Sequence, residues 1–339
     1  MTRILITGGA GFIGIHTANH FAKHELLIVD NLSRRGARSN LEWLKGRTNF
    51  SFSPTDIRNS AALEEDVRKF KPDAVIHLAA QVAVTTSVQD PRTDFDINAL
   101  GTFNVVEAVR NHAPGAIVLY ASTNKVYGGM DDVGVELEGD RYRYSELTHG
   151  VPETYPLDFH SPYGCSKGAA DQYVRDYSRI YGMPSVVFRQ SCIYGTHQYG
   201  IEDQGWIAWF TIASTLGRPI TVYGDGKQVR DVLWAEDLVA AYGLAIDKID
   251  EVKGQVFNIG GGPERQLSLL ETFAELSELS GRKIDFSFAD WRPGDQKVFV
   301  ADTRKAQRSL GWTPTVDTRE GLRRLFSWVS ENKSLFAAP

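Results

Sequence analysis

Tyr163 and Lys167 are the two residues whose types and spacing best suit proton transfer. They stand four residues apart in segment 161–181, which the sequence pattern predicts as a helix, so both side chains lie on one face. An ammonium beside a phenol favours the phenolate and lowers its pKa, which makes Tyr163 a usable base near neutral pH. Thr123 follows the apolar run 116–121, a predicted strand, and its hydroxyl can hold a substrate oxygen in line. We therefore expect Thr123, Tyr163 and Lys167 to be catalytic.

A glycine-rich turn near the start of the chain predicts a dinucleotide site. Gly8, Gly11 and Gly14 lie between a predicted strand over 3–7 and a predicted helix over about 12–23. Glycines in this place allow a tight turn, the close approach of backbone N–H groups to a pyrophosphate, and close packing of the helix on the sheet. Position at a strand–helix junction is the context in which such a motif is informative.

Asp30 ends the next predicted strand, 26–30, and helps to distinguish NAD from NADP as the cofactor. A carboxylate there can accept hydrogen bonds from both ribose hydroxyls and repels a 2′-phosphate, so NAD is favoured. Arg34 and Arg35 keep NADP open as an alternative, because their guanidinium groups could reach a 2′-phosphate.

These residues need a scaffold, and the chain alternates predicted strands and helices. Further strands are expected over 49–53, 74–78, 116–121 and 185–189, with helices over 61–70, from Pro91 to about 111, and over 161–181. Apolar runs in this order predict an α/β fold with a doubly wound parallel sheet covered on both faces. Residues 1–195, with segments returning near 230–260, are predicted to form the dinucleotide-binding domain.

Residues 196–339 are predicted to form mainly a smaller α/β substrate-binding part. Short strands are expected over 220–223 and 230–233, and helices over 235–247, 268–280 and 317–329. Because no linker rich in Pro, Gly or Ser separates the two parts, we expect the smaller one to pack against the sheet.

Composition excludes several classes of protein. The 339 residues include 37 basic and 42 acidic side chains, a net charge of −5 that argues against general nucleic-acid binding. Two cysteines, Cys165 and Cys192, exclude a disulfide scaffold and suit a reducing cytoplasm. No apolar run approaches the roughly 20 residues that span a bilayer, so no membrane association is expected. No His/Cys spacing suggests a metal site.

Together these motifs resemble the extended short-chain dehydrogenase/reductases. The resemblance covers nearly the whole chain and rests on Gly8-x-x-Gly11-x-x-Gly14, His77-Leu78-Ala79-Ala80, Asn98 before Gly101-Thr102, Val126-Tyr127-Gly128 and Tyr163-x-x-x-Lys167. More narrowly, the runs 122–128, 161–168, 189–195 and 200–206 resemble the CDP-paratose 2-epimerases (CDP-tyvelose epimerases).

The resemblance implies a nucleotide-sugar epimerase. Bound NAD takes a hydride from C2 of a CDP-hexose while Tyr163 takes the hydroxyl proton, and the hydride then returns to the other face of the keto sugar. The 4-epimerases of the UDP-galactose type remain the nearest alternative; a net NAD-dependent sugar dehydrogenase and a non-catalytic NAD-binding regulator are less favoured. Sugar 4,6-dehydratases carry acidic residues directly after the Ser/Thr, where this chain has Asn124 and Lys125. Elimination of water needs such an acid, so dehydration is disfavoured.

The resemblance also implies two sets of binding residues. The cofactor set is Gly8, Gly11, Phe12, Ile13, Gly14, Asp30, Asn31, Asp56, Ile57, Leu78, Ala79, Ala80, Asn98, Tyr163 and Lys167. The substrate set is Thr123, Asn124, Lys125, Gln204, Tyr223, Arg230 and Arg292. Arginines suit two phosphates because the guanidinium is a planar, permanently charged fork. Lys125 is expected near the sugar; the alternative is a lysine that points to solvent.

Four further features carry expectations. His77, on a buried strand, is expected to be a core histidine whose hydrogen bonds are satisfied, and Cys192 a small buried hydrophobe. Segment 129–159 is expected to be either a lid over the sugar or a solvated surface insertion. A homodimer is expected, as in the family, through Ala169, Ala170, Tyr173 and Tyr177 on one helix and Phe103, Val106 and Val109 on another, unless these side chains pack in the protomer's own core.

Overall fold

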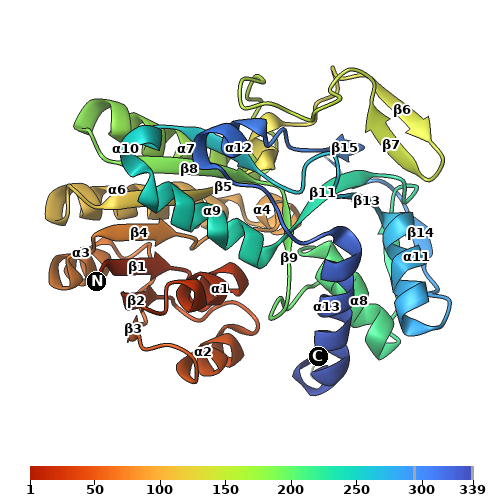
Figure 1. The fold of residues 1–339 in the computed structure, drawn as a ribbon, viewed down its shortest axis with the longest axis horizontal. Helices are drawn as coiled ribbons and strands as arrows, with labels where there is room; N and C mark the ends of the chain where they lie inside the picture. Colours follow the sequence, from red (N-terminus) through yellow and green to blue (C-terminus); the bar gives the residue numbers. More distant parts are fainter. Residues whose placement is uncertain (293–294, 337–339) are drawn as a thin grey trace.

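Seven parallel strands form the central sheet, as the apolar runs predict. The structure, a computed structural model, describes residues 1–292 and 295–336. The strands of this sheet are β1 (Arg3–Thr7), β2 (Glu25–Val29), β3 (Ser51–Ser53), β4 (Ala74–His77), β5 (Ile117–Thr123), β8 (Ser185–Gln190) and β12 (Val256–Ile259). Their order is β3-β2-β1-β4-β5-β8-β12, and each neighbouring pair is parallel (Figure 1). The order reverses between β1 and β4, and ligands of such sheets bind at the carboxyl ends of the strands beside this point.

Two helical layers cover the sheet. One face carries α1 (Phe12–His20), α2 (Ala37–Lys45), α9 (Ala235–Asp247), α10 (Ile249–Val252) and α12 (Arg304–Leu310), and the other carries α3 (Ser60–Phe70), α6 (Gly101–His112) and α7 (Ser161–Tyr181). Successive residues of a strand pack alternately against the two helical layers. In β1, Ile4 and Ile6 belong to the first apolar cluster and Leu5 to the second. This double burial explains why the strands read as continuous apolar runs.

The remaining elements lie mostly to one side of the sheet (Figure 1). Their strands are the hairpin β6 (Val135–Glu138) and β7 (Arg141–Tyr144), the pair β10 (Thr221–Tyr223) and β14 (Ser287–Ala289), and the group β9 (Cys192–Tyr194), β11 (Val229–Trp234), β13 (Gln266–Ser268) and β15 (Val298–Phe299). Their helices are α8 (Trp206–Leu216), α11 (Leu269–Ser280), α13 (Thr318–Glu331) and the 3-10 turn η3 (Lys333–Phe336). Strand β12 returns to the edge of the large sheet beside β8. A domain boundary near residue 195 stays a prediction.

The single helix expected from Pro91 to about 111 is interrupted. After α4 (Val84–Gln89), the chain forms α5 (Pro91–Phe95), a π-helical turn η1 (Asp96–Leu100) and then α6. A π turn inserts an extra residue into the helix and is frequent near functional sites. Close packing leaves no room for a side chain at Gly101, because a Cβ there would stand 2.6 Å from the Ile57 side chain.

Segment 129–159 is not a lid over either cavity described below. None of its residues lines them. It contains the β6–β7 hairpin, in which β7 contacts β11, β13 and β15. Tyr142 Oη donates to Asp225 at 2.6 Å, and Tyr144 Oη donates to the carbonyl of Val298 at 2.8 Å. The expectation of a lid is therefore wrong, and the segment is a surface insertion anchored by its tyrosines.

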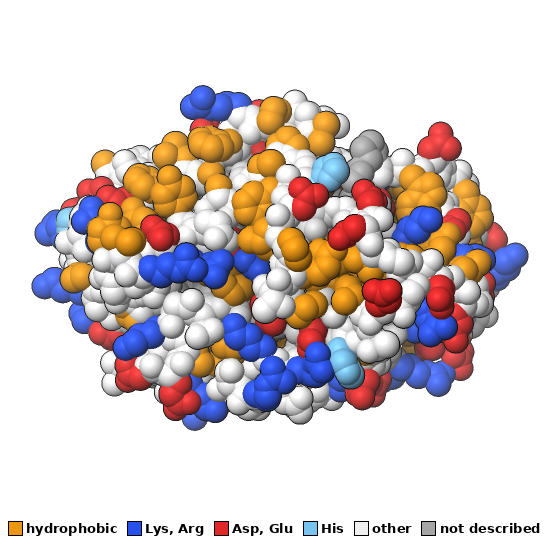
Figure 2. Space-filling model, turned by 90° about the horizontal axis from the view of Figure 1, so that it is seen from above, with side chains coloured by type: hydrophobic (Ala, Val, Ile, Leu, Met, Phe, Trp, Pro, Cys, Tyr) orange, Lys and Arg blue, Asp and Glu red, His pale blue; other side chains and the backbone are white. Residues whose placement is uncertain are grey.

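The surface and the helices add two observations. On the face drawn in Figure 2, basic and acidic side chains are interspersed, and apolar side chains gather in patches between them. Within residues 1–292 and 295–336, no helix is long and apolar enough to cross a bilayer.

Candidate active site

The glycine turn between β1 and α1 lines a cavity of about 250 Å³, called here the first cavity. Gly8 has a φ of +68°, and a Cβ on it would lie 2.7 Å from the backbone nitrogen of Ala79. A Cβ on Gly14 would lie 2.3 Å from the carbonyl oxygen of Gly8, so α1 can approach the turn only with glycine there.

The same turn leaves helix α1 open toward the first cavity. At Gly11, which precedes the helix, a Cβ would meet only the Gly8 carbonyl within 4 Å and would otherwise project into the space beside the turn. No side chain caps the helix, and its first turn holds no acidic residue. Its N–H groups therefore remain available to an anion such as a pyrophosphate, and the cradle fits a dinucleotide.

Asp30 lies in the first cavity directly after β2 and also fixes the glycine turn. Its carboxylate accepts hydrogen bonds from the backbone N–H of Leu32 at 2.7 Å and of Ala10 at 3.1 Å. Burial raises the pKa of Asp30, and the two hydrogen bonds act in the opposite direction. Asp56 lies nearby, where hydrogen bonds from Arg58 hold its pKa at about 2, so that side chain is ionised.

Fourteen of the fifteen predicted cofactor residues line the first cavity. They are Gly8, Gly11, Phe12, Ile13, Gly14, Asp30, Asn31, Asp56, Ile57, Leu78, Ala79, Ala80, Tyr163 and Lys167. Asn98 is the exception. It is buried in the π turn, and the backbone of Gln81 holds its amide: Nδ2 donates to the carbonyl of Gln81 at 3.0 Å, and Oδ1 accepts from the Gln81 N–H at 2.9 Å. Asn98 therefore supports the wall of the cavity from behind instead of lining it.

A second cavity, of about 580 Å³, adjoins the first and lies in the size range of small-molecule sites. All seven predicted substrate residues line it: Thr123, Asn124, Lys125, Gln204, Tyr223, Arg230 and Arg292. Tyr163 and Gln204 line both cavities. Two ligands bound side by side would therefore meet at Tyr163.

The three predicted catalytic residues come from two elements. Thr123 is the last residue of β5, and Tyr163 and Lys167 lie in the first two turns of α7. Tyr163 is hydrogen-bonded to Thr123, and Lys167 Nζ donates to the carbonyl of Ala121 at 2.6 Å. The sheet edge and the helix thus hold a hydroxyl, a phenol and an amine at one place, as the spacing predicts.

The expected lowering of the Tyr163 pKa is wrong for the groups of this chain. Burial raises the pKa of Tyr163 to about 12, and the hydrogen bond with Thr123 only partly offsets it. Burial also lowers the pKa of Lys167 to about 7, although Asp171 and Asp94 act in the opposite direction. Desolvation outweighs the pairing that the spacing suggested, because both groups are enclosed.

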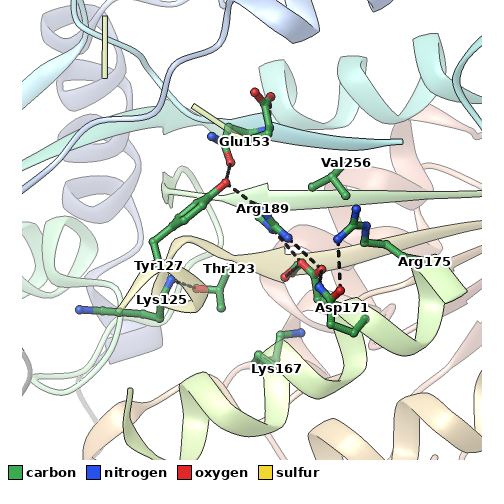
Figure 3. A network of polar contacts seen from close by, with 12 residues as sticks. Thr123, Lys125, Tyr127, Glu153, Lys167, Asp171, Arg175, Arg189 and Val256 are labelled. Atoms are coloured by element: carbon green, nitrogen blue, oxygen red, sulfur yellow. Dashed lines mark hydrogen bonds and ion pairs between the residues drawn. The ribbon is translucent and has the colours of Figure 1, made fainter. Parts of the chain in front are cut away.

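A buried polar network holds strand β5 and helix α7 together behind this site (Figure 3). Asp171, one turn after Lys167, accepts hydrogen bonds from Arg189 on β8 at 2.9 and 3.1 Å and from Ser122 at 2.8 Å. Arg189 also donates to Tyr127 Oη at 3.1 Å, which donates to Asn258 on β12 at 2.7 Å. The network fixes Ser122, and with it the neighbouring Thr123, relative to the helix.

The arginines of the second cavity are held by carboxylates and an aromatic ring. Arg230 Nη2 donates to Asp295 at 2.8 Å. Arg292 pairs with Asp203 at 3.0 Å, and its guanidinium carbon lies 3.8 Å from the ring centroid of Tyr223. Pairing and stacking preorganise both planar groups toward an anion.

Lys125 lines the second cavity and is not a solvent-facing lysine. It lies in the 3-10 turn η2 (Asn124–Tyr127), and its Nζ donates to Gln296 at 3.5 Å. Burial, followed by the charge of Arg230, lowers its pKa to about 8. The cavity therefore holds a cation that loses its charge within the range of ordinary assays.

His77 has the buried environment that the sequence predicts, whereas Cys192 is only partly buried and lines the second cavity. His77 lies between two threonine hydroxyls, 2.6 Å from Thr7 and 2.9 Å from Thr102, and burial lowers its pKa to about 3, so it is neutral. Cys192 accepts a hydrogen bond from Trp206 at 3.4 Å, and burial raises the pKa of its thiol. A thiol with a raised pKa is a poor nucleophile.

Contacts across the mouth of the first cavity were not anticipated from the sequence. Arg34 Nη2 donates to Gln204 Oε1 at 2.6 Å. Tyr199 packs on Gly36, where a Cβ would stand 2.1 Å from its ring, and Asn40 donates to the carbonyl of His197 at 3.4 Å. The partners are more than 150 residues apart, so no local pattern predicts these contacts. The only signal in the sequence is that Arg34 stands close to Asp30.

Comparison with known proteins places the chain in a family. A family model described as GDP-mannose 4,6 dehydratase matches residues 5–325. The CDP-paratose 2-epimerase of Salmonella typhi is 44% identical over 335 residues, covering 97% of this chain and 99% of that protein. The UDP-glucose 4-epimerase of Thermotoga maritima, solved with UDP-glucose, is 31% identical with a TM-score of 0.84, covering 98% of this chain and 99% of the other.

A second solved structure is similar to this chain over nearly its full length. The UDP-glucose 4-epimerase of Thermus thermophilus, in complex with NAD, is 31% identical with a TM-score of 0.81, covering 99% of this chain and 100% of the other. Sequence and fold match along nearly the full length in each case. The chain therefore belongs to the extended short-chain dehydrogenase/reductase family, in the group matched by the GDP-mannose 4,6 dehydratase model.

Proposed function

We propose that this protein is an NAD-dependent nucleotide-sugar epimerase that inverts C2 of a CDP-hexose through a transient keto sugar. The observation that carries the proposal is that Tyr163, on one helix with Lys167, lines both cavities. NAD in the first cavity would accept a hydride from a sugar carbon and return it. The 44% identity to the Salmonella CDP-paratose 2-epimerase supports the choice of substrate.

The residues of the chain divide the remaining work. Thr123 holds the reacting hydroxyl in line, and Tyr163 takes its proton as the carbonyl forms and returns it when the hydride adds to the opposite face. Lys167 is held on the Ala121 carbonyl, and its positive charge would have to act against the burial that raises the pKa of Tyr163 to about 12. Arg230 and Arg292 suit the diphosphate, which anchors the nucleotide while the keto sugar turns.

Dehydration, the reaction in the name of the matching family model, is disfavoured by the contents of the second cavity. Elimination needs an acid and a base beyond the tyrosine. Asn124 and Lys125 occupy the positions after Thr123. The carboxylates that line the cavity have other partners: Asp295 pairs with Arg230, Asp203 with Arg292, and Glu202 accepts from Tyr223.

Inversion at C4 is the second candidate function. The solved relatives from Thermotoga and Thermus, each 31% identical, are UDP-glucose 4-epimerases, and that reaction needs the same three catalytic groups. The two reactions differ in how the sugar is seated over Tyr163, which depends on the second cavity. We favour C2 because the relative with the higher identity has that activity in its name.

One experiment separates these candidates. The purified protein is incubated with CDP-, UDP-, GDP- and dTDP-hexoses without added NAD, and NMR identifies the carbon that inverts; Tyr163→Phe is the control. Inversion at C2 of a CDP-hexose supports the proposal, and inversion at C4 of a UDP-hexose replaces it. Turnover only with stoichiometric free NAD would identify a net dehydrogenase, and no turnover of any sugar would favour an NAD-binding regulator.

We also propose that the protein is a cytoplasmic homodimer. Its two cysteines are free, as in a reducing compartment. Four of the side chains expected at a dimer face, Val106, Val109, Ala170 and Tyr177, are buried in the protomer's own core, so that part of the expectation is wrong. Phe103 and Tyr173 remain exposed and in contact, with ring centroids 5.6 Å apart, beside exposed Phe95, Leu100 and Ile180. Such a patch favours an interface between copies.

A further inference from the structure

Asp94 is a buried carboxylate that none of the catalytic steps above uses. It lies in α5 and is 1% exposed. Its oxygens accept hydrogen bonds from Gln81 Nε2 at 2.8 Å, Asn98 Nδ2 at 3.1 Å and Ser166 Oγ at 2.5 Å. All three donors are neutral, and the ion pairs found among the described residues do not include Asp94. Burying a carboxylate without a cation is costly, so its place calls for an explanation.

The partners of Asp94 connect it to the catalytic pair. Ser166 stands between Tyr163 and Lys167 on α7, and its hydroxyl also lies 3.2 Å from the Tyr163 carbonyl. Gln81 follows the segment 78–80 that lines the first cavity. One carboxylate therefore joins a wall of the first cavity to the first turns of the catalytic helix.

The charge of Asp94 also bears on Lys167. Three other groups lie near that amine: Asp171 from α7, neutral His77 from β4, and Tyr120 from β5, whose ring centroid lies 4.4 Å from Nζ. Asp171 is matched by Arg189 in a bidentate ion pair. Among the described residues, Asp94 is thus the carboxylate near Lys167 that has no cation of its own.

We propose that Asp94 is a positioning residue for the Tyr163–Lys167 pair. Its carboxylate fixes the start of α7 through Ser166 and supplies the buried negative charge that keeps Lys167 protonated. The proposal rests on the proposed function in so far as that function uses the pair for proton transfer.

The direction of the effect follows from the charge. A negative Asp94 raises the pKa of Tyr163 and opposes the lowering of the Lys167 pKa by burial. The active form has Tyr163 ionised and Lys167 charged, so the Tyr163 pKa sets the low-pH limb of the pH–rate profile and the Lys167 pKa sets the high-pH limb. Without the carboxylate both pKa values fall, so both limbs of the pH–rate profile move to lower pH. A neighbouring charge of this kind shifts a pKa by about one unit or more.

The experiment compares Asp94→Asn with Asp96→Asn in the NAD-loaded enzyme. Asp96 lies two residues further along, and its carboxylate forms an ion pair with Arg92, 82% exposed, at 2.8 Å. We expect the profile of kcat/KM to move to lower pH by about one unit for Asp94→Asn and to stay in place for Asp96→Asn. An unmoved profile for an active, NAD-loaded Asp94→Asn would overturn the proposal, as would an equal shift in Asp96→Asn.

Two further measurements keep the proposal testable. Ser166→Ala removes the link but keeps the charge, so kcat should fall while the profile stays in place; an unchanged kcat would overturn the positioning role.

Ultraviolet titration of tyrosinate, taken as the difference from Tyr163→Phe, should show a lower Tyr163 pKa in Asp94→Asn, and an unchanged value contradicts the charge effect. Because this titration needs no substrate, it tests the role of Asp94 independently of the epimerase proposal. The epimerase proposal is contradicted if the parent enzyme inverts no sugar.

Discussion

Arg34 donates a hydrogen bond to Gln204 at 2.6 Å, joining segments 170 positions apart across the first cavity. The Arg34 side chain is exposed, although the surrounding groups desolvate its guanidinium enough to lower its pKa. At an exposed place, where solvent screens the charge, such a hydrogen bond contributes up to about 1 kcal/mol. The contact therefore joins loop 196–205 to the segment after β2 at the first cavity.

Arg34→Ala should weaken the retention of NAD. We expect NAD affinity to fall by up to about fivefold, which corresponds to the loss of that hydrogen bond. NAD content after gel filtration and the dissociation constant by calorimetry measure it. Arg38→Ala, a change to a solvent-exposed arginine on α2, is the matched control. Equal NAD content in both variants would show that the Arg34–Gln204 contact does not retain the cofactor.

The cofactor released by denaturing the purified protein should be NAD. Asp30 lies where the adenosine ribose is expected, and its carboxylate repels a 2′-phosphate. Arg34 and Arg35 line the same cavity, and one donor of Arg34 is taken by Gln204. Chromatography of the supernatant identifies the nucleotide. Recovery of NADP alone would contradict the role given to Asp30.

Tyr163→Phe should lower kcat by about 10²–10⁴-fold without loss of bound NAD. The phenyl ring still fills the junction of the two cavities, and only the group that carries the proton is removed. Stopped assays of sugar inversion give kcat, and absorbance of the released nucleotide gives NAD content. A variant with nearly the parent rate would mean that another group acts as the base.

Lys125→Met should raise KM for the anionic substrate and change its pH dependence. Burial lowers the pKa of Lys125 from 10.5 to about 8, so its charge is present below pH 8 and lost above it. In the parent, KM should rise as pH increases through 8. In the variant, KM should already be high at pH 7 and should not show this rise. Kinetic constants equal to the parent's at both pH values would exclude a contact with substrate.

Light scattering at micromolar concentration should give the mass of a dimer. Tyr173 is 48% exposed and touches Phe103 at the centre of the apolar patch on α5–α7. Tyr173→Glu places a charge in that patch and should shift the protein to monomers. Phe288→Glu, at an exposed aromatic position on β14, is the control and should leave the dimer intact. A monomeric parent would contradict the proposal.

Local sequence determined the scaffold because local physics controls it. The apolar runs of β1, β4 and β5 are buried on both faces, and the glycines at 8 and 14 have no room for a Cβ. The first pattern therefore predicted the parallel sheet, and the second predicted the tight turn. The spacing of Tyr163 and Lys167 put them on one face of a helix for the same reason. Helix α8 and the π turn were not anticipated, since tertiary contacts stabilise them.

Only the tertiary structure decided what surrounds those groups. Helix spacing predicted a Tyr163 pKa lowered by Lys167, but enclosure by distant segments raises it instead. The apolar stripe of α7 could face a partner or the core, and packing put Ala170 and Tyr177 inside while leaving Tyr173 outside. The contacts of Arg34 with Gln204 and of Asp94 with Ser166 join residues far apart in the chain, so no local pattern encodes them. Residue types thus determine which chemistry is available, whereas burial, which depends on the whole fold, decides the charge each group carries.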